Sequence, residues 1–384
     1  MFGMFGVLGV LGVLGVLGVL GVLQGRRDAV ARAPPARWVS EAARAWFGLK
    51  YGRGAGGLCR LESRAGPAGT RARPVPGRCR RCRDRGALRS DGPGGDSSEA
   101  GVESMAGPEY VRAHRLQEAL ECLAAGGFEI LCGGTDWYPA NAQRACSTAL
   151  VDISGLSELR QIEQDESGVE IGAAGTWSEI RESEWPASMA AVPAAAREIG
   201  GIQIQNTGSI GGNVCNASPA ADGIVALLAL DARLVLASRR GTRELALAEF
   251  VAGARRTLLR RDELLRAVRI PARGRRARSV FAKLGSRRHL VISIAMVAVQ
   301  LDSDEAGRIL TAAIAVGSCS AHALRLGVLE ARLLGHGVSE DLAALVRPTD
   351  LAGLAPIDDV RAGRAYRQSA AEILVRRALT EAKA

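Results

Sequence analysis

The chain has 384 residues, enough for two or three domains with their own cores, and 47% of them are hydrophobic, which is typical of a folded globular protein. Its net charge of +10 would favour nucleic acid or an anionic membrane as a partner, but residues 1–104 contain 17 basic and 8 acidic residues, so the rest is close to neutral. A nucleic-acid-binding or membrane-tethered protein would therefore depend on the N-terminal segment alone, and we expect neither partner.

Residues 1–104 differ in composition from the rest of the chain. The first 23 residues carry no charge and are long enough to span a membrane, but a GVL repeat places glycine at every third position, which weakens a helix. The stretch that follows is rich in Arg, Gly, Pro and Ser and cannot bury enough apolar surface to fold. Cys79 and Cys82 form a single C-x-x-C pair, from which we expect no metal site. We interpret residues 1–104 as a disordered segment or a spurious extension before Met105, with a membrane anchor as the alternative.

From Met105 the sequence alternates helix and strand patterns. Residues 108–127 predict a short strand and then an amphipathic helix, with apolar Leu116, Ala119, Leu120 and Leu123 at helical spacing and a Gly-Gly stop. Further strands are predicted within 128–136, 148–156, 168–176 and 263–271, a helix within 185–201, and a helix that leads into a strand within 222–238.

A basic connector at 272–279 marks a boundary, after which a second unit begins. Strands are predicted within 279–302 and 309–320, and helices within 324–335 and 365–382. The last helix is expected to bury a stripe formed by Tyr366, Ala370, Ile373, Leu374 and Ala378. The whole pattern indicates an α+β protein with two units.

Two glycine-centred segments, ILCGGTDW at Ile130–Trp137 and GSIGGNVCNASPAAD at Gly208–Asp222, each follow a stretch that we expect to be extended. Consecutive N–H groups in such segments bind anionic oxygens, and glycine lets a ligand approach the main chain. Thr135, Ser209 and Asn213 add short donors, whereas the Asp222 carboxylate accepts hydrogen bonds from hydroxyls. The two segments therefore predict a ligand with a diphosphate and a polyol. Neither is a P-loop or a Rossmann turn, and taken singly each glycine pair also fits a bulge or a tight turn.

Together with LLALDA, DELLRAVRIP and FAKLGSRR, these segments resemble the FAD-binding medium subunit of the xanthine dehydrogenase and carbon monoxide dehydrogenase family of molybdenum hydroxylases. AAIAVGSCS and LRLGVLEARLLG resemble the C-terminal domain of those subunits. The resemblance runs from about Met105 to the end. It implies a two-subdomain FAD-binding domain of the vanillyl-alcohol-oxidase-like, PCMH type at 105–272, followed by a smaller α+β domain with helices on a sheet at 273–384.

The resemblance also implies which residues contact FAD. The first glycine segment and Ser209–Asn213 would wrap the diphosphate, Asp222 would hold the ribityl or ribose side, and Ile199, Leu265 and Lys283 would contact the cofactor. The implied cofactor-binding residues are Ile130, Leu131, Cys132, Gly133, Gly134, Thr135, Asp136, Trp137, Ile199, Ser209, Ile210, Gly211, Gly212, Asn213, Asp222, Leu265 and Lys283.

Three of these positions leave alternatives open. Some relatives place an aromatic ring at the position of Ile199, whereas this chain has an aliphatic side chain there. Trp137 and Tyr138 are candidates to replace that ring, with plain packing as their alternative role. Lys283 is one of three lysines in the chain, and its alternative is a solvated charge at a strand edge.

The function implied by the resemblance is electron transfer. The flavin would take electrons from [2Fe-2S] clusters of a small partner subunit, fed by a molybdenum cofactor on a large partner subunit, and pass them to NAD⁺ or another acceptor. The cysteines after Met105 lack cluster spacing, and the four histidines form no metal motif, so we expect no metal site and no catalytic acid or base in this chain. Scattered cysteines also indicate free thiols in the cytoplasm. The alternative is a stand-alone FAD-dependent oxidase or reductase of the same fold.

Overall fold

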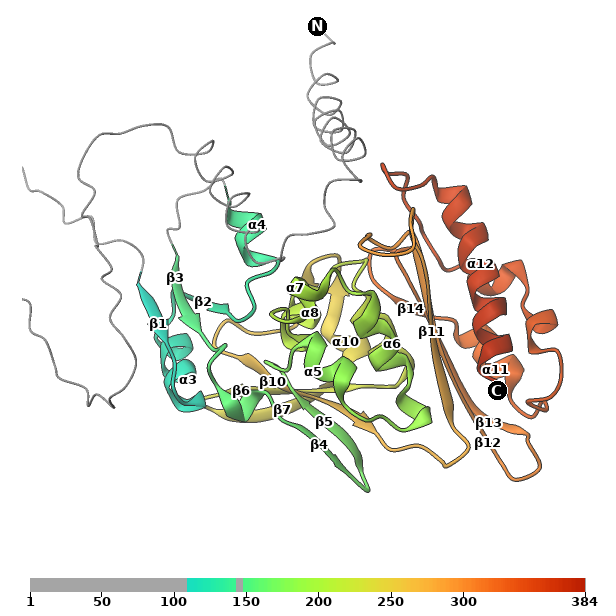
Figure 1. Ribbon diagram of the computed structural model, residues 1–384, viewed down its shortest axis with the longest axis horizontal. Coiled ribbons are helices and arrows are strands. Elements are labelled where there is room, and N and C mark those ends of the chain that lie inside the picture. Colours follow the sequence, from blue (N-terminus) through green and yellow to red (C-terminus); the bar gives the residue numbers. More distant parts are fainter. Residues whose placement is uncertain (1–108, 143–147, 384) are drawn as a thin grey trace, which may run out of the picture. The chain divides into compact units, whose positions relative to one another are not determined.

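The computed structural model describes residues 109–142 and 148–383 (Figure 1). The expectations for residues 1–104, including the GVL repeat and the Cys79–Cys82 pair, lie outside the described residues. The described residues belong to one compact unit that spans Ser98–Ala384.

The first described elements form a small parallel sheet covered by one helix. Its strands, in spatial order, are β1 (Tyr110–Arg112), β3 (Ala149–Asp152) and β2 (Phe128–Leu131). Helix α3 (Leu116–Ala125) buries Ala119, Leu120 and Leu123 and ends at Gly126, whose φ of 83° is favoured by glycine. The predicted strand, amphipathic helix and Gly-Gly stop are therefore confirmed here. A short helix, α4 (Trp137–Asn141), follows the turn after β2.

An antiparallel five-stranded sheet forms the centre of the unit. Its strands, in order, are β4 (Ile162–Asp165), β5 (Gly168–Gly172), β10 (Leu264–Pro271), β6 (Arg233–Ser238) and β7 (Gly241–Ala246). The sequence patterns predicted β5, β10 and β6, but they missed β4 and β7. Both missed strands lie at sheet edges and contain no fully buried side chain, so they lack a buried alternating pattern.

Helices and short turns connect these strands and build the core above the sheet. They are η2 (Ser157–Leu159), α5 (Trp177–Glu182), η3 (Ala187–Met189), α6 (Ala191–Glu198), α7 (Ile202–Gln205), α8 (Ile210–Asn216), α9 (Asp222–Ala229), α10 (Leu247–Phe250) and the hairpin β8 (Val251–Gly253) and β9 (Arg256–Thr257). Every residue of α9 is buried, because this helix contacts both the central core and the sheet that follows.

The C-terminal part is a second antiparallel sheet with helices on one face. Its strands are β11 (Arg278–Leu284), β12 (Ala295–Ser303), β13 (Ile309–Gly317) and β14 (Leu324–Arg325), in that order. Helices α11 (Gly327–Leu333) and α12 (Arg364–Glu381) pack on one face (Figure 1), with turns η4 (Leu342–Leu345) and η5 (Pro348–Leu351) between them. Helices α6 and α9 contact the same strands and share a core with Met296, Ala298 and Ala315. The expected α+β architecture with helices on a C-terminal sheet is thus present.

The predicted stripe of α12 is partly wrong. Ala370, Leu374 and Ala378 are buried, but Tyr366 and Ile373 are each 56% exposed. At about 100° per residue, the buried positions centre on Ala371 and Ala378, and the two exposed side chains lie more than 90° away from that centre. The buried face includes a charged residue instead, Arg367, which is fully buried and donates to the carbonyls of Ile294 and Ser318 and to Asp359.

Candidate functional site

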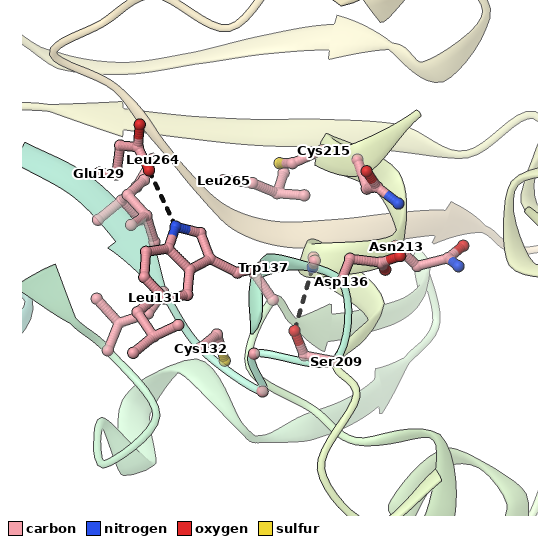
Figure 2. A pocket seen from close by; sticks show the side chains of 18 of the residues that line it. Glu129, Leu131, Cys132, Asp136, Trp137, Ser209, Asn213, Cys215, Leu264 and Leu265 are labelled. Atoms are coloured by element: carbon pink, nitrogen blue, oxygen red, sulfur yellow. Dashed lines mark hydrogen bonds between the residues drawn. The ribbon is translucent and has the colours of Figure 1, made fainter. Parts of the chain in front are cut away.

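A cavity of about 610 Å³ lies beside the two glycine-centred segments (Figure 2). Its size is within the range of about 300–1,000 Å³ that is usual for small-molecule and cofactor sites. Most of the residues that the sequence assigned to cofactor binding line it, namely Ile130, Leu131, Cys132, Gly133, Gly134, Thr135, Asp136, Trp137, Ile199, Ser209, Gly211, Gly212, Asn213 and Leu265. Ile210, Asp222 and Lys283 do not line it. Two segments about seventy residues apart in sequence therefore share one cavity.

The first glycine segment turns sharply at the end of β2 and packs against the second. A Cβ atom on Gly133 would lie 1.9 Å from the carbonyl oxygen of Thr207, a distance that no side chain tolerates. Gly134 has a φ of +66°, in the left-handed region that favours glycine. Gly133 is thus required for the contact between the segments, and Gly134 for the turn.

The second glycine segment contains the whole of α8, and its two adjacent glycines lie in the first turn of that helix. The expectation that an extended stretch precedes it is wrong, because the short helix α7 comes directly before it. Ser209 is the N-cap residue of α8, and its hydroxyl accepts a hydrogen bond of 3.1 Å from the Gly212 amide (Figure 2). The N-terminal amide groups of this helix are bonded within the protein, since Ile210 and Gly211 donate to the carbonyls of Gly175 and Ala173, and Asn213 donates to that of Ser209.

The two glycines of α8 have different surroundings. A Cβ atom on Gly211 would lie 2.6 Å from the Ala173 carbonyl oxygen, at the end of β5. A Cβ atom on Gly212 would meet only the Ser209 hydroxyl, at 3.1 Å, and otherwise project into open space. Gly211 is thus needed for packing on the central sheet, whereas Gly212 leaves bare backbone at the cavity.

Two thiols lie in the cavity wall (Figure 2). Burial raises the pKa of Cys215 to about 12. Burial also raises the pKa of Cys132, against the lowering effect of a hydrogen bond with Ser209. Both groups are therefore neutral at physiological pH, and they bring neither a nucleophile nor a negative charge to the wall.

Asn213 carries a buried acceptor that the protein does not satisfy. Its side-chain oxygen Oδ1 has no hydrogen-bond partner among the described residues. No solvent reaches this oxygen, and it lies toward Gly223 in the interior, where a Cβ atom would be 2.8 Å from it.

Trp137 forms part of the cavity rim in a fixed orientation. Its Nε1 donates to Glu129 Oε2 at 2.9 Å (Figure 2), and its ring meets the ring of Tyr138 edge to face, with centroids 5.2 Å apart. Tyr138 does not line the cavity and is 59% exposed. Of the two aromatic candidates, only the tryptophan is placed to contact a ligand there.

Asp222 and Lys283 form a buried ion pair outside this cavity. Lys283 Nζ lies 2.7 Å from Asp222 Oδ2, and both side chains are only 7% exposed. Lys283 also donates to the Glu198 carbonyl, and Ser293 donates to Asp222 Oδ1 at 2.6 Å. Burial raises the pKa of the Asp222 carboxyl, against the lowering effect of Lys283 and Ser293. The alternative of a solvated strand-edge charge for Lys283 is therefore wrong.

Sequence reasoning missed one wall of the cavity, which comes from the β8–β9 hairpin and the loop after it. This wall includes Arg255, Arg260 and Arg261. The dense arginines in RRTLLRR were the available signal, but a run of exposed basic residues is common on protein surfaces.

In the described part of the chain there is no group of three or more His, Cys, Asp or Glu residues that could hold a metal ion. Among the described helices, none is both long and apolar enough to cross a membrane.

Comparisons with known proteins agree with this arrangement. Residues 103–273 match the family described as FAD binding domain in molybdopterin dehydrogenase, and residues 280–382 match the CO dehydrogenase flavoprotein C-terminal domain. The chain is 30% identical to the glyceraldehyde dehydrogenase medium chain of Sulfolobus acidocaldarius, over 71% of this chain and 97% of the relative. It is 35% identical to the nicotinate dehydrogenase FAD-subunit of Eubacterium barkeri, over 54% of this chain and 71% of the relative. A solved carbon monoxide dehydrogenase chain of Hydrogenophaga pseudoflava superimposes with a TM-score of 0.67 at 28% identity, covering 72% of this chain and 97% of that one.

The chain belongs to the FAD-binding medium subunits of the xanthine dehydrogenase and carbon monoxide dehydrogenase family. It is an oxidoreductase subunit, and its cofactor is FAD.

The cavity of this medium subunit fits such a cofactor where its backbone carries no side chain. The bare backbone at Gly212 is a place where a Cβ atom would fill space that a diphosphate needs. When bound, the isoalloxazine of FAD supplies the redox chemistry, and the protein supplies binding and orientation.

Proposed function

We propose that this medium subunit carries FAD as the electron-transfer centre of a molybdenum hydroxylase of the xanthine dehydrogenase type. It takes electrons from iron–sulfur clusters of a small partner subunit, which a molybdenum-cofactor large subunit feeds, and passes them to NAD⁺ or another acceptor. The observation that carries the proposal is the convergence of the two glycine segments on one cavity, with bare backbone at Gly212.

Each part of the cavity has a proposed role toward FAD. Ile130–Trp137 and Ser209–Asn213 hold the diphosphate, because both segments line the cavity and their glycines let a ligand approach the main chain closely. Ile199 and Leu265 contribute aliphatic contacts from the wall. Asp222 and Lys283, which pair outside the cavity, are proposed to contact the cofactor, with the Asp222 carboxylate accepting a hydrogen bond from a hydroxyl on the ribityl or ribose side.

NAD⁺ as acceptor is supported by a second cavity. A hollow of about 510 Å³ adjoins Lys283, and its lining includes Arg197, Arg287, Arg288 and Arg377. Such a concentration of cations suits the diphosphate of a nicotinamide dinucleotide. The partner chains are supported by the relatives, which are named as subunits or medium chains of dehydrogenases.

We also propose the domain limits and the compartment. The FAD-binding domain runs over 105–272 and the C-terminal flavoprotein domain over 273–384, with the boundary at the start of the basic connector. A cytoplasmic location is supported by the free thiols of Cys122, Cys132, Cys215 and Cys319.

The test is purification of the full chain, alone and together with its partner subunits, followed by measurement of bound flavin and reduction of acceptors. We expect the chain alone to be yellow and to release FAD on acid treatment. Only the complex should oxidise substrate and reduce NAD⁺. A colourless chain that takes up no added FAD would refute the flavoprotein assignment. A lone chain that oxidises substrate at the full rate would instead establish the stand-alone oxidase or reductase.

A further inference from the structure

The basic side chains in the wall of the FAD cavity all come from one short stretch. They are Arg255, Arg260 and Arg261, whereas neither Ile130–Trp137 nor Ser209–Asn216 contains a lysine or arginine. The glycine segments therefore offer a diphosphate only backbone dipoles. Full charge opposite the phosphates has to come from this stretch.

Arg255 is held beside the glycine helix by an unusual backbone. It has a φ of +53°, rare for a residue with a side chain, and its amide donates to the Ala217 carbonyl at 2.9 Å. Its Nη1 donates to Asn216 Oδ1 at 2.6 Å. Asn216 is the last residue of α8, about one helical turn beyond Gly212, so this guanidinium lies near the bare backbone of the cavity.

Arg260 and Arg261 are exposed and have little internal compensation for their charge. The nearby carboxylate of Glu263 is already bound by Arg243 through two hydrogen bonds of 2.8 and 2.9 Å. The Arg260 guanidinium lies 3.8 Å from that carboxylate, which is too far for a hydrogen bond. For the Arg261 side chain, the described part of the protein offers no hydrogen bond or ion pair. Both guanidinium groups are therefore available to an anionic ligand.

We propose that Arg255, Arg260 and Arg261 form an arginine edge that pairs with the phosphate groups of FAD and makes the cavity selective for phosphorylated flavins over riboflavin. The inference rests on the proposed function, since it assumes that FAD enters this cavity. Arginine suits the task because its planar fork makes paired, charge-assisted hydrogen bonds with phosphate oxygens.

The experiment compares flavin binding by the full-length apoprotein and its variants. FAD, FMN and riboflavin are titrated at low and high salt, with flavin fluorescence as the readout. The variants are the double change Arg260→Gln with Arg261→Gln, and the single change Arg255→Gln. Arg256→Gln is the matched control, because Arg256 is exposed on the same hairpin but does not line the cavity.

We expect the double variant to raise the Kd for FAD about tenfold, since each exposed charged pair contributes a few-fold. Its FAD binding should also depend less on salt, while its riboflavin binding and the behaviour of Arg256→Gln stay at the wild-type level. The double variant tests the inference even if the positive φ at position 255 makes Arg255→Gln fold poorly.

Two results would overturn the arginine edge without touching the proposed function. One is wild-type FAD affinity and salt dependence in the double variant. The other is an equal loss of affinity for FAD and for riboflavin in the double variant, which would mean that the arginines only shape the cavity or contact a partner subunit. If the wild-type chain binds no FAD at all, the proposed function fails and the inference fails with it.

Discussion

Replacing Gly212 with alanine separates cofactor binding from folding. Gly212 lies in the first turn of α8, and its added methyl group would meet only the Ser209 hydroxyl, at 3.1 Å, before projecting into the cavity. The fold can accept this group with a shift of a few tenths of an ångström. A diphosphate lying against the bare backbone cannot, because the methyl carbon would hold a phosphate oxygen about 3.5 Å away from it.

Gly212→Ala should change the stability of the apoprotein and its affinity for FAD in opposite directions. In a helix, alanine is favoured over glycine by up to about 1 kcal/mol, so the free energy of unfolding of the apoprotein should stay the same or rise. A hydrogen bond to a charged group contributes about 1.5–3 kcal/mol, so losing one such contact should weaken FAD binding about 10- to 150-fold. The variant should therefore fold at least as well as the wild type and hold its cofactor poorly.

The assay is thermal unfolding of the apoprotein together with FAD titration. Gly327→Ala is the matched control, since Gly327 begins α11 and a Cβ atom there has no neighbour within 4 Å. The control should keep wild-type FAD affinity. The reasoning is wrong if Gly212→Ala binds FAD within twofold of the wild type, or if it loses FAD only because the apoprotein no longer folds.

Three further changes test other parts of the molecule. Asp222→Asn leaves the buried Lys283 cation unpaired, so the free energy of unfolding should fall by about 3–5 kcal/mol. The double variant Asp222→Asn with Lys283→Met should regain the free energy of unfolding but not the affinity for FAD. If an FAD titration shows that the affinity recovers as well, the ion pair has a purely structural role. The Arg361 side chain holds the pKa of Asp359 well below its ordinary value, against the opposing effect of burial. A carboxylate whose pKa is lowered by folding stabilises the protein fully above its unfolded-state pKa and loses that effect as the pH falls toward its folded-state pKa. The Tm of the wild type should therefore exceed that of Asp359→Asn by a margin that shrinks below about pH 4. A Tm difference that does not change with pH would contradict this. Trp137→Phe should remove part of the tryptophan quenching caused by FAD, and unchanged quenching would mean that the indole does not contact the cofactor.

The glycine segments were predictable because their requirement is local. Gly134 needs a left-handed backbone, and Gly133 and Gly211 leave no room for a side chain, so the residue type itself reports the geometry. The helical state of the second segment was not predictable in this way. Two adjacent glycines disfavour a helix by intrinsic propensity, and here the Ser209 cap and the contact of Gly211 with Ala173 outweigh that preference.

Long-range pairs were beyond what the sequence could indicate. Asp222 and Lys283 could each be singled out, but they are 61 residues apart, and only the fold reveals that they bind each other. The arginine edge was also missed, because only the fold brings Arg255, Arg260 and Arg261 beside the glycine segments. The error in α12 has a different origin: Tyr366 and Ile373 were placed in the core for their hydrophobicity, whereas helix geometry places Arg367 there and exposes both apolar side chains.

The C-terminal sheet forms contacts with the FAD-binding domain, even though it is a separate sheet. Lys283 lies on β11 of that sheet, yet its ammonium group binds Asp222 at the start of α9 and the Glu198 carbonyl at the end of α6. Because every residue of α9 is buried and the helix contacts β12 and β13, a displacement of the C-terminal sheet would expose apolar surface and leave Asp222 without its cation. The geometry beside the FAD cavity therefore depends on both sheets at once, which gives a physical reason for the two domains to occur in one polypeptide.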